Sequence, residues 1–209
     1  HEFVKGTRIS GRLIDPSPMT EEELAQANAS TEESQAYFAA LCDERRRNPR
    51  DDLITALVQS ETEHGRLSRE ELTSNIALLF AAGHETTVNL LGNALLALYR
   101  NPEQLETLKA RPELMPGAVE EFLRYDSSVQ LTARHALEPA DIAGVELPPG
   151  RSVIAMLGAA NRDPAVFDDP ERLDVTRERV KPMSFGGGIH LCLGGLQPRE
   201  LGAEALAAL

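Results

Sequence analysis

The residue with the clearest chemical potential is a single thiol on a glycine-rich segment. Residues 185–194 read Phe-Gly-Gly-Gly-Ile-His-Leu-Cys-Leu-Gly, so Cys192 follows three consecutive glycines closely. Glycine has no Cβ, so a large flat partner can lie directly on the main chain. A sequence with helical content follows, and the positive end of a helix dipole favours a thiolate over a thiol. The segment indicates a metal ligand. The alternative is that Cys192 is a small buried hydrophobe, as most free cysteines are.

The second cysteine has a different setting. Cys42 follows the apolar stretch 36–41 and is expected to be core packing. Two distant cysteines make no disulfide framework, which favours a reducing compartment. A zinc site at Cys192 fails on ligand count, because His190 is too close in sequence and no other cysteine is near.

Composition and charge exclude several classes of partner. The 209 residues include 33 acidic and 21 basic side chains, giving a formal charge of −12, and a nucleic acid backbone would be repelled. Aromatic residues make up only 4% and tryptophan is absent, which disfavours stacking on single strands. We find no signal segment and no apolar run of about 18 residues that could span a bilayer. The expectation is a cytoplasmic protein with no nucleic acid or membrane partner.

Helices dominate the first 125 residues. Capping boxes at Ser30 to Glu33 and Ser68 to Glu71 each predict a helix start. Apolar residues recur at helical spacing and predict that much of the long helix is buried: Leu72, Ile76, Leu79 and Phe80, then Leu91, Leu95 and Leu98. The helices expected are 30–47, 51–60, 68–100, one that starts at Asn101-Pro102, and one from Met115-Pro116 to about residue 125.

The texture changes after residue 125. Three short segments, 131–136, 145–147 and 151–157, have strand character, and the last two are joined by a Pro-Pro-Gly turn. A small antiparallel sheet is therefore expected, followed by an ordered irregular segment to residue 182. The fold class predicted is mainly α with a small antiparallel β component.

The middle of the long helix carries unusual residues. Gly83 costs about 1 kcal/mol relative to alanine in a helix, and Glu85 and Thr86 need polar partners if they are buried. One interpretation is a planar ligand against Ala81, Ala82 and Gly83, with Glu85 handling protons and the Thr86 hydroxyl bending the local hydrogen bonding. The other is a helix crossing at the small residues with an exposed acid.

Several charged residues are candidates for structural or ligand pairing. Glu121 and Arg124 lie three apart on one helix and can pair, although exposed pairs of this kind contribute little. Arg172 could join them and hold the irregular segment against the helix. Arg134 and His190 could pair with carboxylates of a cofactor, or each could be an ordinary surface residue.

In order along the chain, these segments resemble the bacterial soluble cytochrome P-450 family, which are haem-thiolate monooxygenases. The resemblance covers nearly the whole chain. The matching motifs are Ala-Gly-His-Glu-Thr-Thr at 82–87, Glu-x-x-Arg at 121–124, Asn-Arg-Asp-Pro at 161–164, Pro-Glu-Arg at 170–172, and Phe-x-x-Gly-x-His-x-Cys-x-Gly at 185–194.

The resemblance implies that Cys192 is the proximal thiolate ligand of haem b iron, where it favours O–O cleavage. It implies that Phe185 shields the sulfur, while backbone N–H groups of a loop that includes Gly186 and Gly194 tune it. It also implies that Glu85 and Thr86 are the distal acid and alcohol that deliver protons during dioxygen activation.

Further roles follow from the resemblance. It implies that Arg134 and His190 pair with haem propionates, that Ala82 and Gly83 lie against the haem, and that a buried triad holds the proximal side together. The triad consists of Glu121, Arg124 and Arg172. The resemblance further implies that part of the substrate pocket is lined by Ala81, Val129, Leu131 and Thr132.

The resemblance also implies an incomplete cytochrome P-450 fold. Residues 1–209 are expected to be the C-terminal portion of a single domain, with the N-terminal half and a C-terminal hairpin absent. Its parts are a helical region 1–125, a small sheet and irregular segment 126–182, and the cysteine loop with its following helix 183–209. Pro198 and Gly202 depart from the family's usual helix, and Pro198 is expected to kink it.

The implied function is insertion of one oxygen atom from O2 into a small apolar organic substrate, such as a hydroxylation in secondary metabolism or catabolism. Electrons would come from NAD(P)H through a ferredoxin or flavodoxin-type partner. The alternative is an inactive relative that acts as a binding or assembly partner of another enzyme. Retention of Cys192, Glu85 and Thr86 argues against this alternative.

Overall fold

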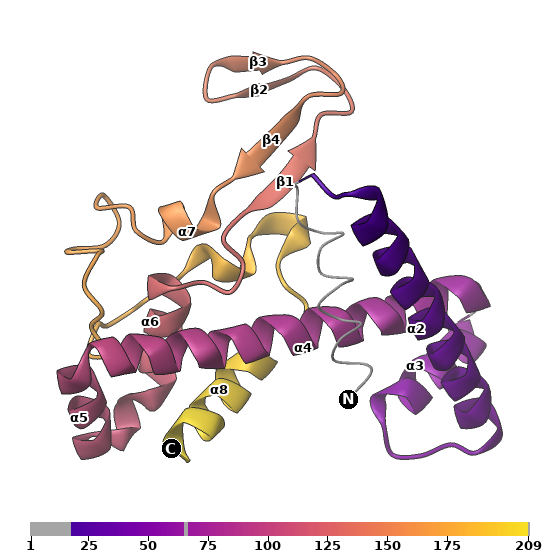
Figure 1. Ribbon diagram of the computed structural model, residues 1–209, viewed down its shortest axis with the longest axis horizontal. Coiled ribbons are helices and arrows are strands. Elements are labelled where there is room, and N and C mark those ends of the chain that lie inside the picture. The colour runs from indigo at the N-terminus through magenta and orange to yellow at the C-terminus, as the bar shows by residue number, and fades with distance from the viewer. Residues whose placement is uncertain (1–17, 65–66, 209) are drawn as a thin grey trace. The chain divides into compact units, whose positions relative to one another are not determined.

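The computed structural model describes residues 18–64 and 67–208. The chain divides into two compact units between Glu85 and Thr86. Figure 1 labels their helices and strands. The described part of the chain is mainly helical with short antiparallel strands, which confirms the predicted fold class. No helix within it is long and apolar enough to cross a membrane. Residues 1–17 of the predicted helical region lie outside the described residues.

Among its described residues, the first unit contains three helical segments, two of which differ from their predicted bounds. Helix α2 (Glu21–Arg47) starts nine residues before Ser30, because Thr20 caps it: the Thr20 Oγ1 accepts from the Glu23 N–H at 3.2 Å. The prediction of a start at Ser30 was wrong. The capping box of Thr20 and Glu23 begins the helix, and the similar pattern at Ser30 to Glu33 lies inside it. Helix α3 (Leu53–His64) is capped by Asp52, whose Oδ1 accepts from the Thr55 N–H at 2.8 Å.

The core of the first unit lies between α2, α3 and the start of the long helix α4 (Arg69–Arg100). It is built from Phe38, Cys42, Val58, Leu72 and Ile76. Cys42 is fully buried in it, as predicted. Leu79 and Phe80 were expected to be buried but are more than a third exposed within the described part of the chain.

Helix α4 confirms the predicted helix 68–100, and its capping box is formed. The Ser68 N–H donates to Glu71 Oε2 at 2.7 Å, and the Glu71 N–H donates to Ser68 Oγ at 3.2 Å. Hydrogen bonds to the Glu71 carboxylate from the Ser68 N–H, and from the Ser68 hydroxyl, hold the pKa of this carboxyl below its ordinary value. The long helix is therefore started by local side-chain chemistry as well as by its apolar pattern.

Substitution Ser68→Ala should destabilise the first unit by about 1 kcal/mol, because an N–H group at the start of α4 loses its acceptor. Chemical denaturation followed by circular dichroism measures this change. Ser74→Ala is the matched control, since Ser74 is exposed further along the same helix and caps nothing. Equal effects of the two substitutions would contradict a capping role for Ser68.

The second unit has its core around helix α6 (Met115–Tyr125). Leu90, Ala94 and Leu98 of α4 pack there with residues of α5 (Pro102–Ala110), α6 and α8 (Gln197–Ala207). A 3-10 turn, η1 (Pro112–Leu114), connects α5 to α6. Leu95 was expected to be buried and is instead 44% exposed.

Four strands form two separate ladders, not the single sheet expected. Strand β1 (Thr132–His135) pairs antiparallel with β4 (Ser152–Ala155), and β2 (Ala140–Ile142) pairs with β3 (Val145–Leu147). Figure 1 shows the two ladders as successive parts of one arm. The Pro-Pro-Gly turn joins β3 to β4, which are not paired with each other.

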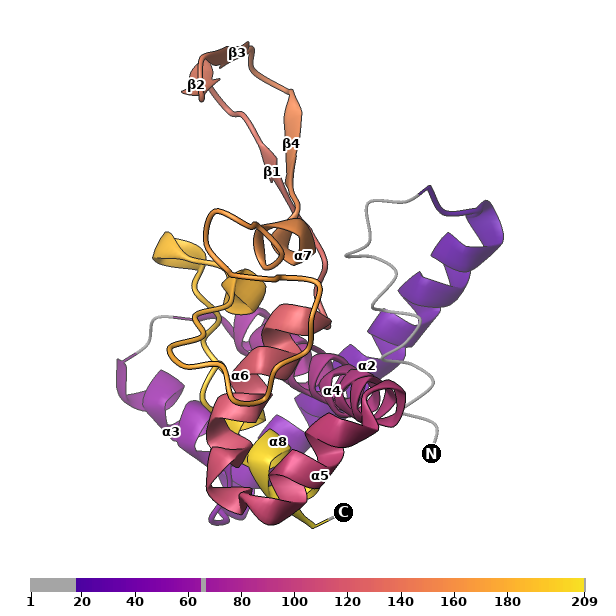
Figure 2. The same ribbon diagram turned by 90° about the vertical axis from the view of Figure 1, so that its left-hand side faces the viewer.

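The segment after the strands is largely irregular, as predicted. It starts with the short helix α7 (Leu157–Ala160) and leads to the 3-10 turns η2 (Met183–Phe185) and η3 (Gly188–His190). Helix α8 then packs beside α6 (Figure 2), and a Cβ on Gly202 would lie 3.4 Å from Val119. Pro198 stands at the start of α8, where its missing N–H is harmless. The expected kink at Pro198 was therefore wrong.

Candidate functional site

The segment around Cys192 folds back on itself. The Cys192 N–H donates to the Phe185 carbonyl at 2.9 Å, and the Gly195 N–H donates to the Cys192 carbonyl at 3.3 Å. Gly186 and Gly188 have φ values of 68° and 63°, a backbone region that favours glycine. The glycines therefore allow the turns that bring Cys192 beside Phe185.

The cysteine loop, residues 185–196, carries an exposed apolar surface. Cys192 is a free, exposed thiol. Its neighbours Ile189 and Leu193 are 97% and 88% exposed, and Leu191 and Leu196 are also exposed. A concentrated apolar surface of this kind indicates a binding surface.

A flat, apolar group with an iron atom fits this surface. A thiolate is one of the axial ligands that proteins offer to haem iron, and Cys192 presents its thiol among apolar side chains. A Cβ on Gly194 would meet no heavy atom within 4 Å, so the main chain there is open to a close approach. No group of three His, Cys, Asp or Glu side chains that could hold a metal ion occurs among residues 18–64 and 67–208.

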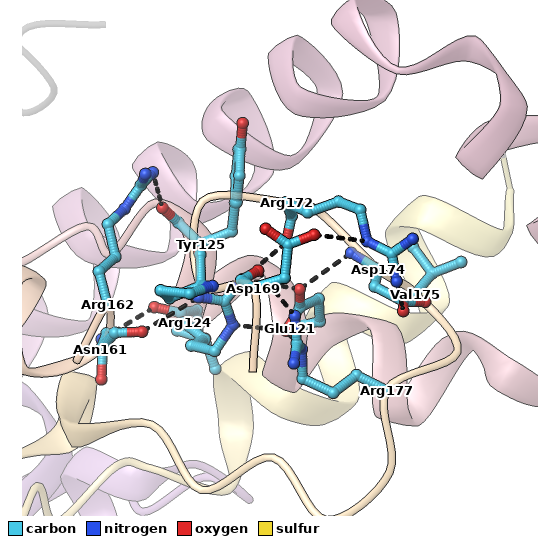
Figure 3. A network of polar contacts seen from close by, with 12 residues as sticks. Glu121, Arg124, Tyr125, Asn161, Arg162, Asp169, Arg172, Asp174, Val175 and Arg177 are labelled. Atoms are coloured by element: carbon cyan, nitrogen blue, oxygen red, sulfur yellow. Dashed lines mark hydrogen bonds and ion pairs between the residues drawn. The ribbon is translucent and has the colours of Figure 1, made fainter. Parts of the chain in front are cut away.

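Glu121 and Arg124 form a buried pair on α6 (Figure 3). The Arg124 Nε donates to Glu121 Oε2 at 2.7 Å and Nη2 donates to Oε1 at 2.8 Å, so the contact is bidentate. The remaining guanidinium hydrogens go to the carbonyls of Asn161, Pro170 and Arg172 at 2.7 to 3.0 Å. One arginine thus ties α6 to two parts of the irregular segment.

The third member of this cluster differs from the prediction. The Arg172 side chain is 62% exposed and pairs with Asp174 and Asp169, so only its main-chain carbonyl reaches Arg124. Arg177, which is 14% exposed, places its Nε 3.3 Å from Glu121 Oε2. The expectation that the Arg172 side chain joins the pair is corrected here. Both arginines lie in a segment without periodicity, so spacing could not choose between them.

Asp174 belongs to the same cluster. Its main-chain N–H donates to Glu121 Oε1 at 3.0 Å. Burial raises the pKa of Asp174, but hydrogen bonds from the Thr176 N–H and hydroxyl, with Arg172 and Arg177 nearby, hold that pKa below its ordinary value. The stability from this ionised carboxylate is therefore present above its ordinary pKa and is lost as the pH falls below it.

Asn161 connects α6 to the start of the cysteine loop. Its side chain is fully buried; Oδ1 accepts from the Met183 N–H at 2.6 Å and Nδ2 donates to Ser184 Oγ at 2.9 Å. The Ser184 hydroxyl donates to the Leu123 carbonyl at 2.7 Å. The chain entering the loop is thus held to α6 by side chains of buried or half-buried residues.

The middle of α4 places the distal candidates on one helix. Glu85 and Thr86 are adjacent and half-buried. Ala81 is half-buried, while Ala82 and Gly83 are exposed, and a Cβ on Gly83 would meet open space. The helix is not broken at Gly83. The surface of α4 at residues 81–83 therefore carries only small side chains on a continuous helix.

The remaining candidates lie on and before β1. Arg134 is exposed, and its Nη1 donates to Thr132 Oγ1 at 2.9 Å and to the Ala133 carbonyl at 2.7 Å. Val129 is exposed, Leu131 and Thr132 are half-buried, and His190 is exposed on η3. The two hydrogen bonds of Arg134 hold its side chain against its own strand.

Sequence reasoning missed the contributions of Arg177, Ser184 and Arg162. Arg162 stacks over the Tyr125 ring at 4.8 Å and donates to the Tyr125 carbonyl at 2.6 Å. The Asn-Arg-Asp-Pro motif at 161–164 was a usable signal for Asn161 and Arg162. Ser184 and Arg177 carry no comparable local pattern.

Comparisons with known proteins point to one family. The "Cytochrome P450" family profile matches residues 16–111 and 106–196. "Putative cytochrome P450 133B2" of Xylella fastidiosa (strain 9a5c) is 49% identical over 183 residues, which are 88% of this chain and 46% of that protein.

Two solved structures show the same fold. Myxobacterial cytochrome P450 CYP267B1 in complex with myristic acid matches with a TM-score of 0.92 and 42% identity, over 100% of this chain and 51% of that chain. P450BioI in complex with hexadec-9Z-enoic acid ligated acyl carrier protein matches with a TM-score of 0.89 and 40% identity, over 99% of this chain and 52% of that chain.

The chain spans about half the length of the curated relatives it matches. The family profile covers most of the chain and includes the Glu121, Arg124 and Cys192 segments. These findings confirm the resemblance seen in the sequence. The chain belongs to the cytochrome P450 family.

Proposed function

We propose that this chain is the part of a haem-thiolate monooxygenase that supplies the iron ligand. The observation that carries the proposal is the exposed Cys192 thiol on a glycine loop surrounded by exposed apolar side chains. The protein containing this chain inserts one oxygen atom from O2 into a small apolar organic substrate.

The proximal residues hold the cofactor. Cys192 would ligate the haem b iron, and the hydrogen bond from its main-chain N–H to the Phe185 carbonyl fixes the main chain that carries the sulfur. Phe185 limits the access of water to the sulfur, and Gly186 and Gly194 let the main chain approach the ring. Arg134 and His190 donate hydrogen bonds to the propionates. When bound, haem supplies the dioxygen chemistry of the reaction.

The distal residues handle protons. The Glu85 carboxylate takes up a proton and the Thr86 hydroxyl passes one on. Consecutive side chains of a helix do not face each other, so the transfer between these two residues of α4 runs through water. Ala82 and Gly83, with no bulky side chains, leave room for the flat cofactor, and Ala81 lines the substrate pocket with Val129, Leu131 and Thr132. The whole protein takes electrons from NAD(P)H through a ferredoxin or flavodoxin-type partner.

The substrate is apolar. The relative solved with myristic acid and the one solved with hexadec-9Z-enoic acid on acyl carrier protein support this choice, because both ligands carry long hydrocarbon chains. Hydroxylation of such a chain in secondary metabolism or catabolism is the reaction proposed.

The test is spectroscopic. Haem is added to the purified protein, which is then reduced and exposed to carbon monoxide. The expected result is the red-shifted Soret band of a thiolate-ligated complex. A haem-loaded protein without this band would instead favour a relative that acts through protein contacts.

Substitution Thr86→Ala should uncouple electron use from product, because the hydroxyl that passes the proton is lost. Product per NAD(P)H consumed should fall, because a positioned proton donor accelerates the step that it assists by about 10²–10⁴-fold. Thr86→Ser, which keeps a hydroxyl, is the matched control. A normal product ratio in Thr86→Ala would count against Thr86 as proton donor.

A further inference from the structure

Arg199 of α8 contacts three parts of the second unit at once. Its guanidinium carbon lies 4.3 Å from the centre of the Phe185 ring. The Arg199 Nε donates to Glu120 Oε1, and Nη2 donates to Glu120 Oε2 at 3.2 Å. Nη1 donates to the Gly195 carbonyl at 2.8 Å. A planar, bidentate cation thus joins α6, the Phe185 ring and the main chain just after Cys192.

Gly195 lies between Arg199, Cys192 and Phe185 and completes this set of contacts. It is buried, and a Cβ added to it would lie 3.4 Å from Arg199 Nη1, 3.4 Å from the Cys192 carbonyl and 3.6 Å from the Phe185 ring. The Gly195 N–H donates to the Cys192 carbonyl, and the Cys192 N–H donates to the Phe185 carbonyl. The contacts run in a closed ring from Arg199 through Gly195, Cys192 and Phe185 back to Arg199.

The residue that holds Arg199 in place, Glu120, lies on helix α6. Glu120 is 21% exposed in its side chain and immediately precedes Glu121, whose pairing with Arg124 fixes α6. A movement of Arg199 would therefore break the Glu120 pair, the stacking on Phe185 and the bond to Gly195 together. The same unit contains a second arginine with a stacked ring and an ion pair, Arg162 with Tyr125 and Glu171, which does not touch the cysteine loop.

We propose that Arg199 is a positioning residue for the Cys192 thiolate: pinned by Glu120, it clamps the Phe185 ring and the Gly195 carbonyl and so fixes the loop geometry. This inference rests on the proposed function, because it concerns the ligand that haem would use. It also places a positive charge on the cysteine loop, at the Gly195 carbonyl and the Phe185 ring. A nearby positive charge favours the reduced, more negative state of a thiolate-bound iron.

The test compares Arg199→Gln, Arg199→Lys and Glu120→Gln, with Arg162→Gln as the matched control. The first measurement is amide hydrogen exchange at Cys192 and Gly195 in the protein without added haem. Arg199→Gln should weaken protection of these two amides about tenfold, and Glu120→Gln should do so partly. Arg162→Gln should leave both amides protected. Unchanged exchange in Arg199→Gln overturns the clamp whether or not haem binds.

The second measurement is the reduction potential of the haem-loaded protein. Arg199→Gln should lower it, because the cation is lost, while Arg199→Lys should keep it near that of the unsubstituted protein although the loop amides exchange faster. A purely structural role predicts equal potentials in all variants, and that result would contradict the proposal. If the unsubstituted protein gives no thiolate-type carbon monoxide band, the proposed function fails, while the exchange data still decide the clamp.

Discussion

Replacing Arg124 by alanine is expected to destabilise the second unit by about 3–5 kcal/mol. The side chain is 1% exposed and donates five hydrogen bonds, two of them to Glu121. Its removal leaves the fully buried Glu121 carboxylate without its main partner and three carbonyls without a donor. Folded domains have net stabilities of roughly 5–15 kcal/mol, so the loss is a large share. Urea denaturation followed by circular dichroism measures it.

Two further variants separate burial from charge. Arg111→Ala removes an exposed pair with Glu113, 3.2 Å apart, and should cost about 0–1 kcal/mol. Arg124→Lys keeps the charge but offers three donors on a single point, so it should recover only part of the loss. Similar stabilities for Arg124→Ala and Arg111→Ala would show that the cluster does not hold the irregular segment to α6.

Local signals explain which elements could be predicted. The helix 68–100 followed from the Ser68 capping box and an unbroken apolar period, and both are present in α4. Strand β2 was missed because its turn to β3 is Ala143-Gly144, with φ of 54° and 83°, a geometry that usually uses Asn-Gly. The pairing of β1 with β4 depends on contacts across 20 residues and leaves no local trace.

In the candidate site, too, features with a local signal could be predicted and features that depend on distant contacts could not. The glycines and Cys192 stand within ten residues, so their shared loop could be predicted from composition alone. The Glu121 and Arg124 pair follows from helical spacing, but its burial depends on Asn161, Pro170 and the segment behind them. The role of Arg199 lay beyond sequence reasoning, because stacking on Phe185 depends on the direction in which α8 leaves the loop.

Substitution Cys192→Ser is expected to abolish the red-shifted carbon monoxide band and substrate oxygenation. Serine offers a neutral hydroxyl where the iron needs a thiolate donor, so the decrease should be essentially complete. The fold should be kept, because Cys192 is exposed and its loop hydrogen bonds use the main chain. Absorption spectra with turnover assays measure the effect, and unchanged turnover would refute the assignment.

Thiol reactivity gives this prediction a control that needs no haem. Cys42 is fully buried, and burial raises the pKa of its thiol, so it should react slowly with a disulfide reagent, while exposed Cys192 reacts quickly. Cys192→Ser should remove the fast phase alone, and Cys42→Ala should leave it intact together with the carbon monoxide band. If Cys192→Ser keeps its fold but loses both the fast-reacting thiol and the carbon monoxide band, the Cys192 sulfur is the iron ligand. A band that survives without the fast thiol requires a different ligand.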